Sequence, residues 1–93
     1  MTVSTLRVDL RVSGCGSAGE VRRQLQAIMD KLHRSFNVSV AAADGAHGPD
    51  SAVLVAAAVG KTRRDARETL ERLADAVAAH PRAEVVASEI TEV

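Results

Sequence analysis

The sequence VSTLRVDLRV at residues 3–12 sets the architecture of this chain. Leu6, Val8 and Leu10 alternate with the charged residues Arg7 and Asp9. Successive side chains of a β-strand point to opposite faces, so this period of two predicts a half-buried strand. Its apolar face is expected to lie on the core, and the face with Arg7 and Asp9 is expected to point away from it.

A helix is predicted directly after this strand, from about Ala18 to Phe36. Ser17 and Glu20 have the S-x-x-E spacing of a capping box, which begins a helix by satisfying free backbone N–H groups. Apolar residues then recur at a period near 3.6, as expected for a helix with one buried face. These residues are Val21, Leu25, Ile28, Met29, Leu32 and Phe36.

Two further strands are predicted after the helix. Residues Val38–Ala43 alternate and are followed by a loop at residues 44–50, which includes Gly, Pro and Asp. Residues Ala52–Val59 are apolar at every position, which favours a central strand with both faces at least partly covered.

A second helix begins after Thr62 and ends before Pro81, and a weaker strand follows at Glu84–Val93. The apolar stripe of this helix consists of Ala66, Leu70, Leu73 and Val77. Simple alternation in the last strand predicts that Val86, Ser88 and Ile90 share one face.

The resulting order, βαββαβ, predicts an α+β, ferredoxin-like sandwich. We expect a four-stranded mixed or antiparallel sheet, with both helices on one face and the first and third strands in the centre. The 93 residues are 46% hydrophobic, and such a chain has enough apolar surface for one core, so we expect a single domain over residues 1–93.

The composition excludes several classes of protein. Twelve basic and twelve acidic residues give no net charge, which argues against strong non-specific binding of nucleic acid. One Cys permits no internal disulfide, and we find neither a long apolar run nor a signal peptide. A cytoplasmic protein without membrane contact is therefore expected.

Two segments resemble the YlxP-like family of bacterial domains of unknown function. The run FNVSVA at residues 36–41, followed by Asp44 and an apolar strand, is similar to the family's core sequence. Residues 17–23, SAGEVRR, resemble its S-L-K-E-K-R-R motif. The resemblance implies a ferredoxin-like fold and no established activity. It also implies a link to ribosomal RNA or a ribosome-assembly partner, because the family's genes lie beside those for translation and ribosome maturation.

Basic side chains on the two helices are the candidate contacts for RNA phosphates. They are Arg22, Arg23, Lys31 and Arg34 on the first helix, and Lys61, Arg63, Arg64 and Arg67 at the start of the second. The chain has no Tyr or Trp, and its one Phe is assigned to the core, so base stacking on the sheet is excluded. A solvated helix surface would have the same pattern, and both interpretations stay open.

The open face of the predicted sheet is a candidate interface of a homodimer. The third strand is apolar on both sides, whereas two helices can cover only one face of the sheet. A second copy packed sheet against sheet would bury the remainder. The candidate interface residues are Arg7, Asp9, Val53, Val55 and Ala57.

The segment Gly14-x-Gly16-x-x-Gly19 matches a dinucleotide-binding fingerprint, and Asp44 would stand where such sites hold a ribose. Binding of an anion or nucleotide at this loop is therefore an alternative function. Glycines that permit a tight turn would give the same pattern, and a strand with one charged face is unlike the buried first strand of such folds.

No set of residues predicts catalysis. Cys15 lies between glycines before a helix, where a thiol can become reactive, but no acid or His is placed by the sequence to assist it. His33, His47 and His80 lack the spacing of metal ligands. We therefore expect a non-catalytic protein with neither a cofactor nor a metal.

Overall fold

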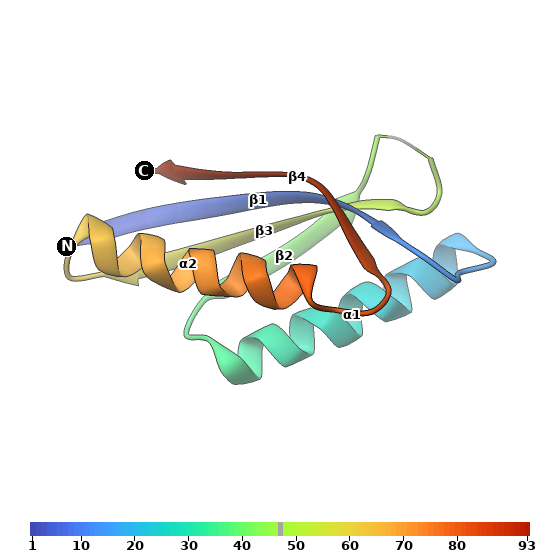
Figure 1. Ribbon diagram of the computed structural model, residues 1–93, viewed down its shortest axis with the longest axis horizontal. Coiled ribbons are helices and arrows are strands. Elements are labelled where there is room, and N and C mark those ends of the chain that lie inside the picture. Colours follow the sequence, from blue (N-terminus) through green and yellow to red (C-terminus); the bar gives the residue numbers. More distant parts are fainter. Residues whose placement is uncertain (47) are drawn as a thin grey trace.

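The computed structural model describes residues 1–46 and 48–93, and its elements follow the order βαββαβ (Figure 1). The ends of the predicted elements agree with the structure to within a residue or two. The elements are β1 (Thr2–Val12), α1 (Ala18–Ser35), β2 (Ser39–Asp44), β3 (Ser51–Gly60), α2 (Arg63–Ala78) and β4 (Ala83–Glu92).

The four strands form one sheet in the order β2-β3-β1-β4, and both helices lie on the same side of it (Figure 1). The predicted ferredoxin-like sandwich is confirmed, with β1 and β3 in the centre. Every neighbouring pair is antiparallel. The sheet is therefore not mixed: β1 and β2 run in the same direction, but β3 lies between them.

The core lies between the sheet and the helices and consists of the residues that satisfy the strand and helix periods. Leu6, Val8 and Leu10 of β1 are each 1% exposed, and they face the buried stripes of the helices. Those stripes are Val21, Leu25, Ile28 and Leu32 on α1, and Ala66, Leu70, Leu73 and Val77 on α2. Phe36 caps the C-terminus of α1 and is partly buried against this core, so it closes the helix end instead of extending its stripe.

The two faces of β3 differ although all of its residues from 52 to 59 are apolar. Ala52, Leu54, Ala56 and Ala58 are at most 2% exposed and point toward the helices. On the opposite face, Val53 and Ala57 are partly exposed, and Val55 and Val59 are exposed. We call this second side of the sheet the open face.

A β-bulge in β4 corrects the predicted alternation of the last strand. Asp9 pairs with Ala87, but the next residue, Leu10, pairs with Val85, which leaves Val86 as the extra residue. Val85 is therefore partly buried against the core, while Val86 is 55% exposed. The prediction that Val86 shares a face with Ser88 and Ile90 is wrong, because a bulge reverses the alternation at that point.

Candidate interaction surfaces

The basic residues predicted on α1 all lie on its solvent side. Ser17 caps this helix by accepting a hydrogen bond from the backbone N–H of Glu20. Because the apolar stripe faces the core, Arg22, Arg23, Lys31 and Arg34 are exposed. Within residues 1–46 and 48–93, no ion pair is formed by any of these four side chains.

The two carboxylates of α1 are already engaged. Glu20 accepts a hydrogen bond from the backbone N–H of Gly16 at 2.8 Å, which completes the predicted capping box. Asp30 accepts one from the side-chain amide of Gln26 at 2.9 Å. The exposed side of α1 therefore presents cations that its own acids do not neutralise.

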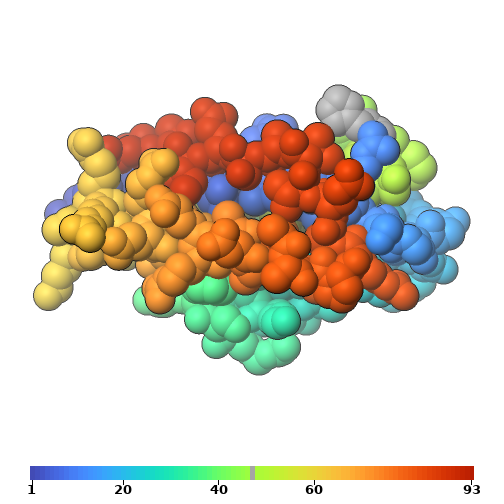
Figure 2. Space-filling view, in the orientation of Figure 1, coloured from blue at the N-terminus to red at the C-terminus, as the bar shows by residue number. Residues whose placement is uncertain are grey.

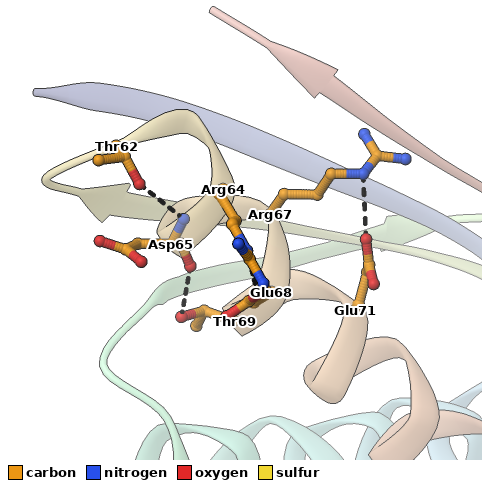
Figure 3. Close-up of polar contacts among 7 residues, drawn as sticks. All are labelled: Thr62, Arg64, Asp65, Arg67, Glu68, Thr69 and Glu71. Atoms are coloured by element: carbon orange, nitrogen blue, oxygen red, sulfur yellow. Dashed lines mark hydrogen bonds and ion pairs between the residues drawn. The ribbon is translucent and has the colours of Figure 1, made fainter.

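The arginines at the start of α2 are paired with carboxylates. Arg63 pairs with Glu92 of β4 at 2.6 Å. Arg64 pairs with Glu68 at 2.9 Å, and Arg67 pairs with Glu71 at 3.0 Å (Figure 3). The hydrogen bond to Glu68, and then the charge of that carboxylate, raise the pKa of Arg64.

The helix N-terminus beside these arginines is also capped from within. The Thr62 hydroxyl accepts a hydrogen bond from the backbone N–H of Asp65 at 3.1 Å, and Asp65 supplies negative charge in the first turn (Figure 3). Lys61 is exposed and forms no ion pair with a described residue. Of the α2 residues predicted to bind phosphate, Arg63, Arg64 and Arg67 would first have to give up an acidic partner.

The glycine-rich loop before α1 forms a turn whose backbone N–H groups are partly occupied. Gly14 has a φ of 74°, a conformation that favours glycine. The Glu20 carboxylate binds the Gly16 N–H, at the place where a dinucleotide site needs a phosphate. In addition, β1 is antiparallel to both of its neighbours, whereas dinucleotide folds pair their first strand in parallel.

Cysteine and histidine form no recognisable centre. Cys15 is partly buried, and its sulfur lies 3.8 Å from the backbone oxygen of Ser13. The described residues contain no group of three or more potential metal ligands. His80 accepts a hydrogen bond from the backbone N–H of Arg82, and His47 lies outside the described residues.

The open face brings together all five predicted interface residues. Strand register places Arg7 opposite Val55 and Asp9 opposite Val53, with Ala57 next along β3. Arg7 and Asp9 form an exposed ion pair at 3.2 Å. The open face therefore has an apolar half on β2 and β3 beside a charged half on β1 and β4.

Large apolar side chains are exposed mainly on this face and at its ends. Among the described residues they are Met1, Val3, Val55, Val59, Val86 and Val93. Val3, Val55 and Val59 belong to the open face by register, and Val93 lies beside Val3 because it donates its backbone N–H to Val3. The exposed sides of α1 and α2 contribute none of them.

Two hollows flank the sheet. One, of about 190 Å³, is lined by Asp9, Arg11, Gly45 and Val86 among others, and the bulge supplies its Val86 wall. Sequence alternation missed this position because nothing in the residue pattern marks the bulge. The other, of about 330 Å³, lies between α2 and β4, where β1 shows through the surface (Figure 2). Arg67 and Glu71, which line the second hollow, are paired with each other.

None of the described helices combines the length and apolarity that a membrane crossing requires.

Known structures with a similar fold have little sequence in common with this chain. A protein from Chloroflexus aurantiacus J-10-fl, assigned as an antibiotic biosynthesis monooxygenase, is 19% identical with a TM-score of 0.60, covering 96% of this chain and 90% of that one. A protein assigned as a chlorite dismutase is 13% identical with a TM-score of 0.58, covering 99% of this chain but 44% of its own length. The designed protein Foldit4 is 15% identical with a TM-score of 0.52, covering 98% and 96%. At these identities the likeness shows the fold alone.

The sequence comparisons give one match. A family model described as "Protein of unknown function (DUF503)" matches residues 3–90. No curated protein matches the chain.

Proposed function

The chain belongs to DUF503, a family of unknown function, and we propose that it is a non-catalytic cytoplasmic accessory protein that contacts the phosphate backbone of structured or ribosomal RNA through α1. Membership of the YlxP-like family, with its link to ribosome maturation, is part of this proposal. FNVSVA at residues 36–41 supports it.

One observation supports the α1 surface above the others. Arg22, Arg23, Lys31 and Arg34 are exposed on one helix without an ion pair to any described residue, whereas Arg63, Arg64 and Arg67 of α2 are each paired. Unpaired cations can bind phosphate without first losing an internal partner. From Arg22 to Arg34 the helix rises about 18 Å, at 1.5 Å per residue, so the surface is long enough to follow a nucleic-acid strand.

The mode of binding follows from the side chains present. With no Tyr or Trp in the chain and Phe36 packed against the core, the described surface offers no aromatic platform for bases. Phosphate contacts do not distinguish sequences, so binding is expected to depend on RNA shape and on salt.

The test compares two double variants of equal charge change. Arg22→Gln with Arg23→Gln removes unpaired cations, and Arg63→Gln with Arg64→Gln removes paired ones. Binding to a fluorescent RNA hairpin and co-sedimentation with ribosomal particles are measured over a range of salt. The α1 double variant is expected to lower the salt dependence by about one unit of log K against log salt per lost contact, while the α2 double variant stays close to the parent.

Two results would contradict this proposal. One is unchanged RNA affinity in the α1 double variant. The other is binding that persists undiminished at high salt, because phosphate contacts weaken as salt rises.

The open face supports a second candidate function, a homo-oligomeric protein-interaction module. The supporting observation is that Val3, Val55 and Val59 are exposed together on a face that no helix covers. Patches of this kind on small proteins typically mark an interface.

Sedimentation velocity tests the second candidate over micromolar concentrations. The parent is expected to dimerise, and Val55→Asp is expected to give a folded monomer because it places an unpaired charge in the apolar half. Ala76→Asp, on the exposed side of α2, is the matched control and is expected to remain dimeric. A parent chain that stays monomeric would refute the second candidate.

A further inference from the structure

We infer that the occupant of the open face is a second copy of this chain, packed face to face about a two-fold axis that crosses the strands between Arg7 and Asp9. The inference rests on the second candidate function and adds the identity of the partner and the register of the contact. It does not depend on RNA binding by α1.

Two neighbouring rows of side chains cross the middle of the open face. Pairing of the strands places Ala41, Val55, Arg7 and Glu89 in the first row. It places Ala43, Val53, Asp9 and Ala87 in the second row. Each row is apolar on β2 and β3, and Arg7 and Asp9 stand at equivalent places with opposite charge.

A two-fold axis in the plane of the interface and perpendicular to the strands reverses the order of residues along each strand. If the axis passes midway between the two rows, Arg7 of one copy lies over the partner's Asp9. The same operation places Val55 over the partner's Val53. An isologous interface must match itself in this way, and here charge and apolarity match about a single axis.

An axis parallel to the strands does not give this match. Placed midway between β1 and β3, it would lay Arg7 over the partner's Val55, because these residues pair within the sheet. The arginine and its Asp9 partner would then lose water without gaining an opposite charge, which is unfavourable. The perpendicular axis instead extends the Arg7–Asp9 ion pair into a square of four alternating charges.

The charges also favour a second copy over a polyanion. By register the open face includes Arg7, Asp9, Arg11, Glu84 and Glu89, in which acids outnumber bases. Nucleic acid would meet those acids directly. A copy of the same face brings equal numbers of both signs and can pair them.

The area is sufficient for a moderate dimer. Four strands about 4.8 Å apart, paired over ten residues at about 3.3 Å each, give a footprint of roughly 600 Å² per copy. Two such faces bury about 1,200 Å², the lower end of the range for stable interfaces. Dimerisation is therefore expected to depend visibly on concentration.

The decisive experiment uses charge reversals that repel alone and attract together. In an Arg7→Asp homodimer, two acids would face each other across the axis, and in an Asp9→Arg homodimer, two bases would. Each variant alone is expected to dimerise about tenfold or more weakly than the parent. An equimolar mixture restores opposite charges across the axis and is expected to form the mixed dimer, which native mass spectrometry identifies by mass.

The mixture isolates contacts between copies. Within one chain, positions 7 and 9 have like charges in both variants, so mixing changes only what each copy meets in the other. Thermal unfolding of each variant at low concentration confirms that it is folded. Recovery of the mixed dimer supports the axis.

Three other outcomes would overturn parts of this inference and can be told apart. A monomeric parent refutes both the second copy and the homo-oligomeric function. A dimer that Val55→Asp leaves intact places the interface elsewhere. A dimer that Val55→Asp breaks, but that mixing the charge-reversed variants does not restore, keeps the open-face function and refutes this axis.

Discussion

Gly60 joins β3 to α2 in a turn that has no room for a side chain. A Cβ atom at this position would lie 2.6 Å from the backbone nitrogen of Ala66 and 2.9 Å from the backbone oxygen of Thr62. The glycine of the sequence GKT is therefore required for close packing of the helix start, and a phosphate-binding role is not needed to explain it.

Replacing this glycine is expected to destabilise the protein. Gly60→Ala should lower the free energy of unfolding by about 1–3 kcal/mol, because the neighbouring atoms are backbone and cannot move aside easily. Urea unfolding followed by circular dichroism measures the change. Gly16→Ala is the control, since a Cβ there meets nothing closer than 3.9 Å. Equal losses in the two variants would contradict this explanation.

The predicted side-chain sites differ in how far the sequence could place them. The pairs Arg64 with Glu68 and Arg67 with Glu71 follow from helix periodicity, since residues four apart are neighbours. The pair Arg63 with Glu92 joins α2 to β4 and has no local signal. That contact, which neutralises a predicted phosphate ligand, required the tertiary structure.

Helix α1 is held to the sheet by a single stripe of buried residues. Leu25 is 6% exposed and Ile28 is 2% exposed, and both contact the core. The helix pattern was predictable because its apolar period is regular from the Ser17 cap to Phe36.

Truncating this stripe is expected to remove much of the stability. Leu25→Ala or Ile28→Ala should cost about 2–5 kcal/mol, from lost burial and from the cavity left behind. Chemical unfolding measures this loss. Ala27→Ser, on the exposed side of the same helix, should change stability by less than about 1 kcal/mol. A loss below about 1 kcal/mol at Leu25 would mean that α1 packs differently.

Strand β4 shows where alternation fails as a predictor. The pattern from Glu84 to Val93 contains two adjacent valines, and either one could face the core. The bulge selects Val85. Because a bulge depends on pairing with β1, the isolated sequence of β4 does not specify it.

Deleting Val86 tests this assignment. Since the extra residue has no partner in β1, its removal should produce a regular ladder in which Val85 and Ala83 still face the helices. The free energy of unfolding is expected to change by less than about 1 kcal/mol. Deleting Ser88 instead should cost more, because it removes a paired residue and breaks the register with Val8. Hydrogen exchange of the β4 amides would report both results, and equal disruption would contradict the bulge.

For the molecule as a whole, order and periodicity of the elements were enough to predict the sandwich. Strand order followed from the connection rules for βαββαβ chains, and the central place of β3 from its fully apolar sequence. The sequence did not specify strand register, which determines that Arg7 and Asp9 stand in adjacent rows. The proposed axis could therefore be located only from the structure.

Coupling between folding and association gives one more prediction. If two copies share the open face, the midpoint of thermal unfolding should rise with protein concentration, because the dimer binds only folded chains. Calorimetry at two concentrations about a hundredfold apart measures the rise, and Val55→Asp should abolish it. A midpoint independent of concentration in the parent would contradict self-association.

The central position of β1 has a consequence for how the protein is made. This strand leaves the ribosome first, yet its two neighbours are β3 and β4, and Ser4 pairs with Glu92 near the end of the chain. During translation the apolar side of β1 therefore waits for almost the whole sequence before its ladder is complete. Non-local pairing of this kind slows folding. The nascent chain is expected to keep its first strand exposed to chaperones until synthesis is nearly finished.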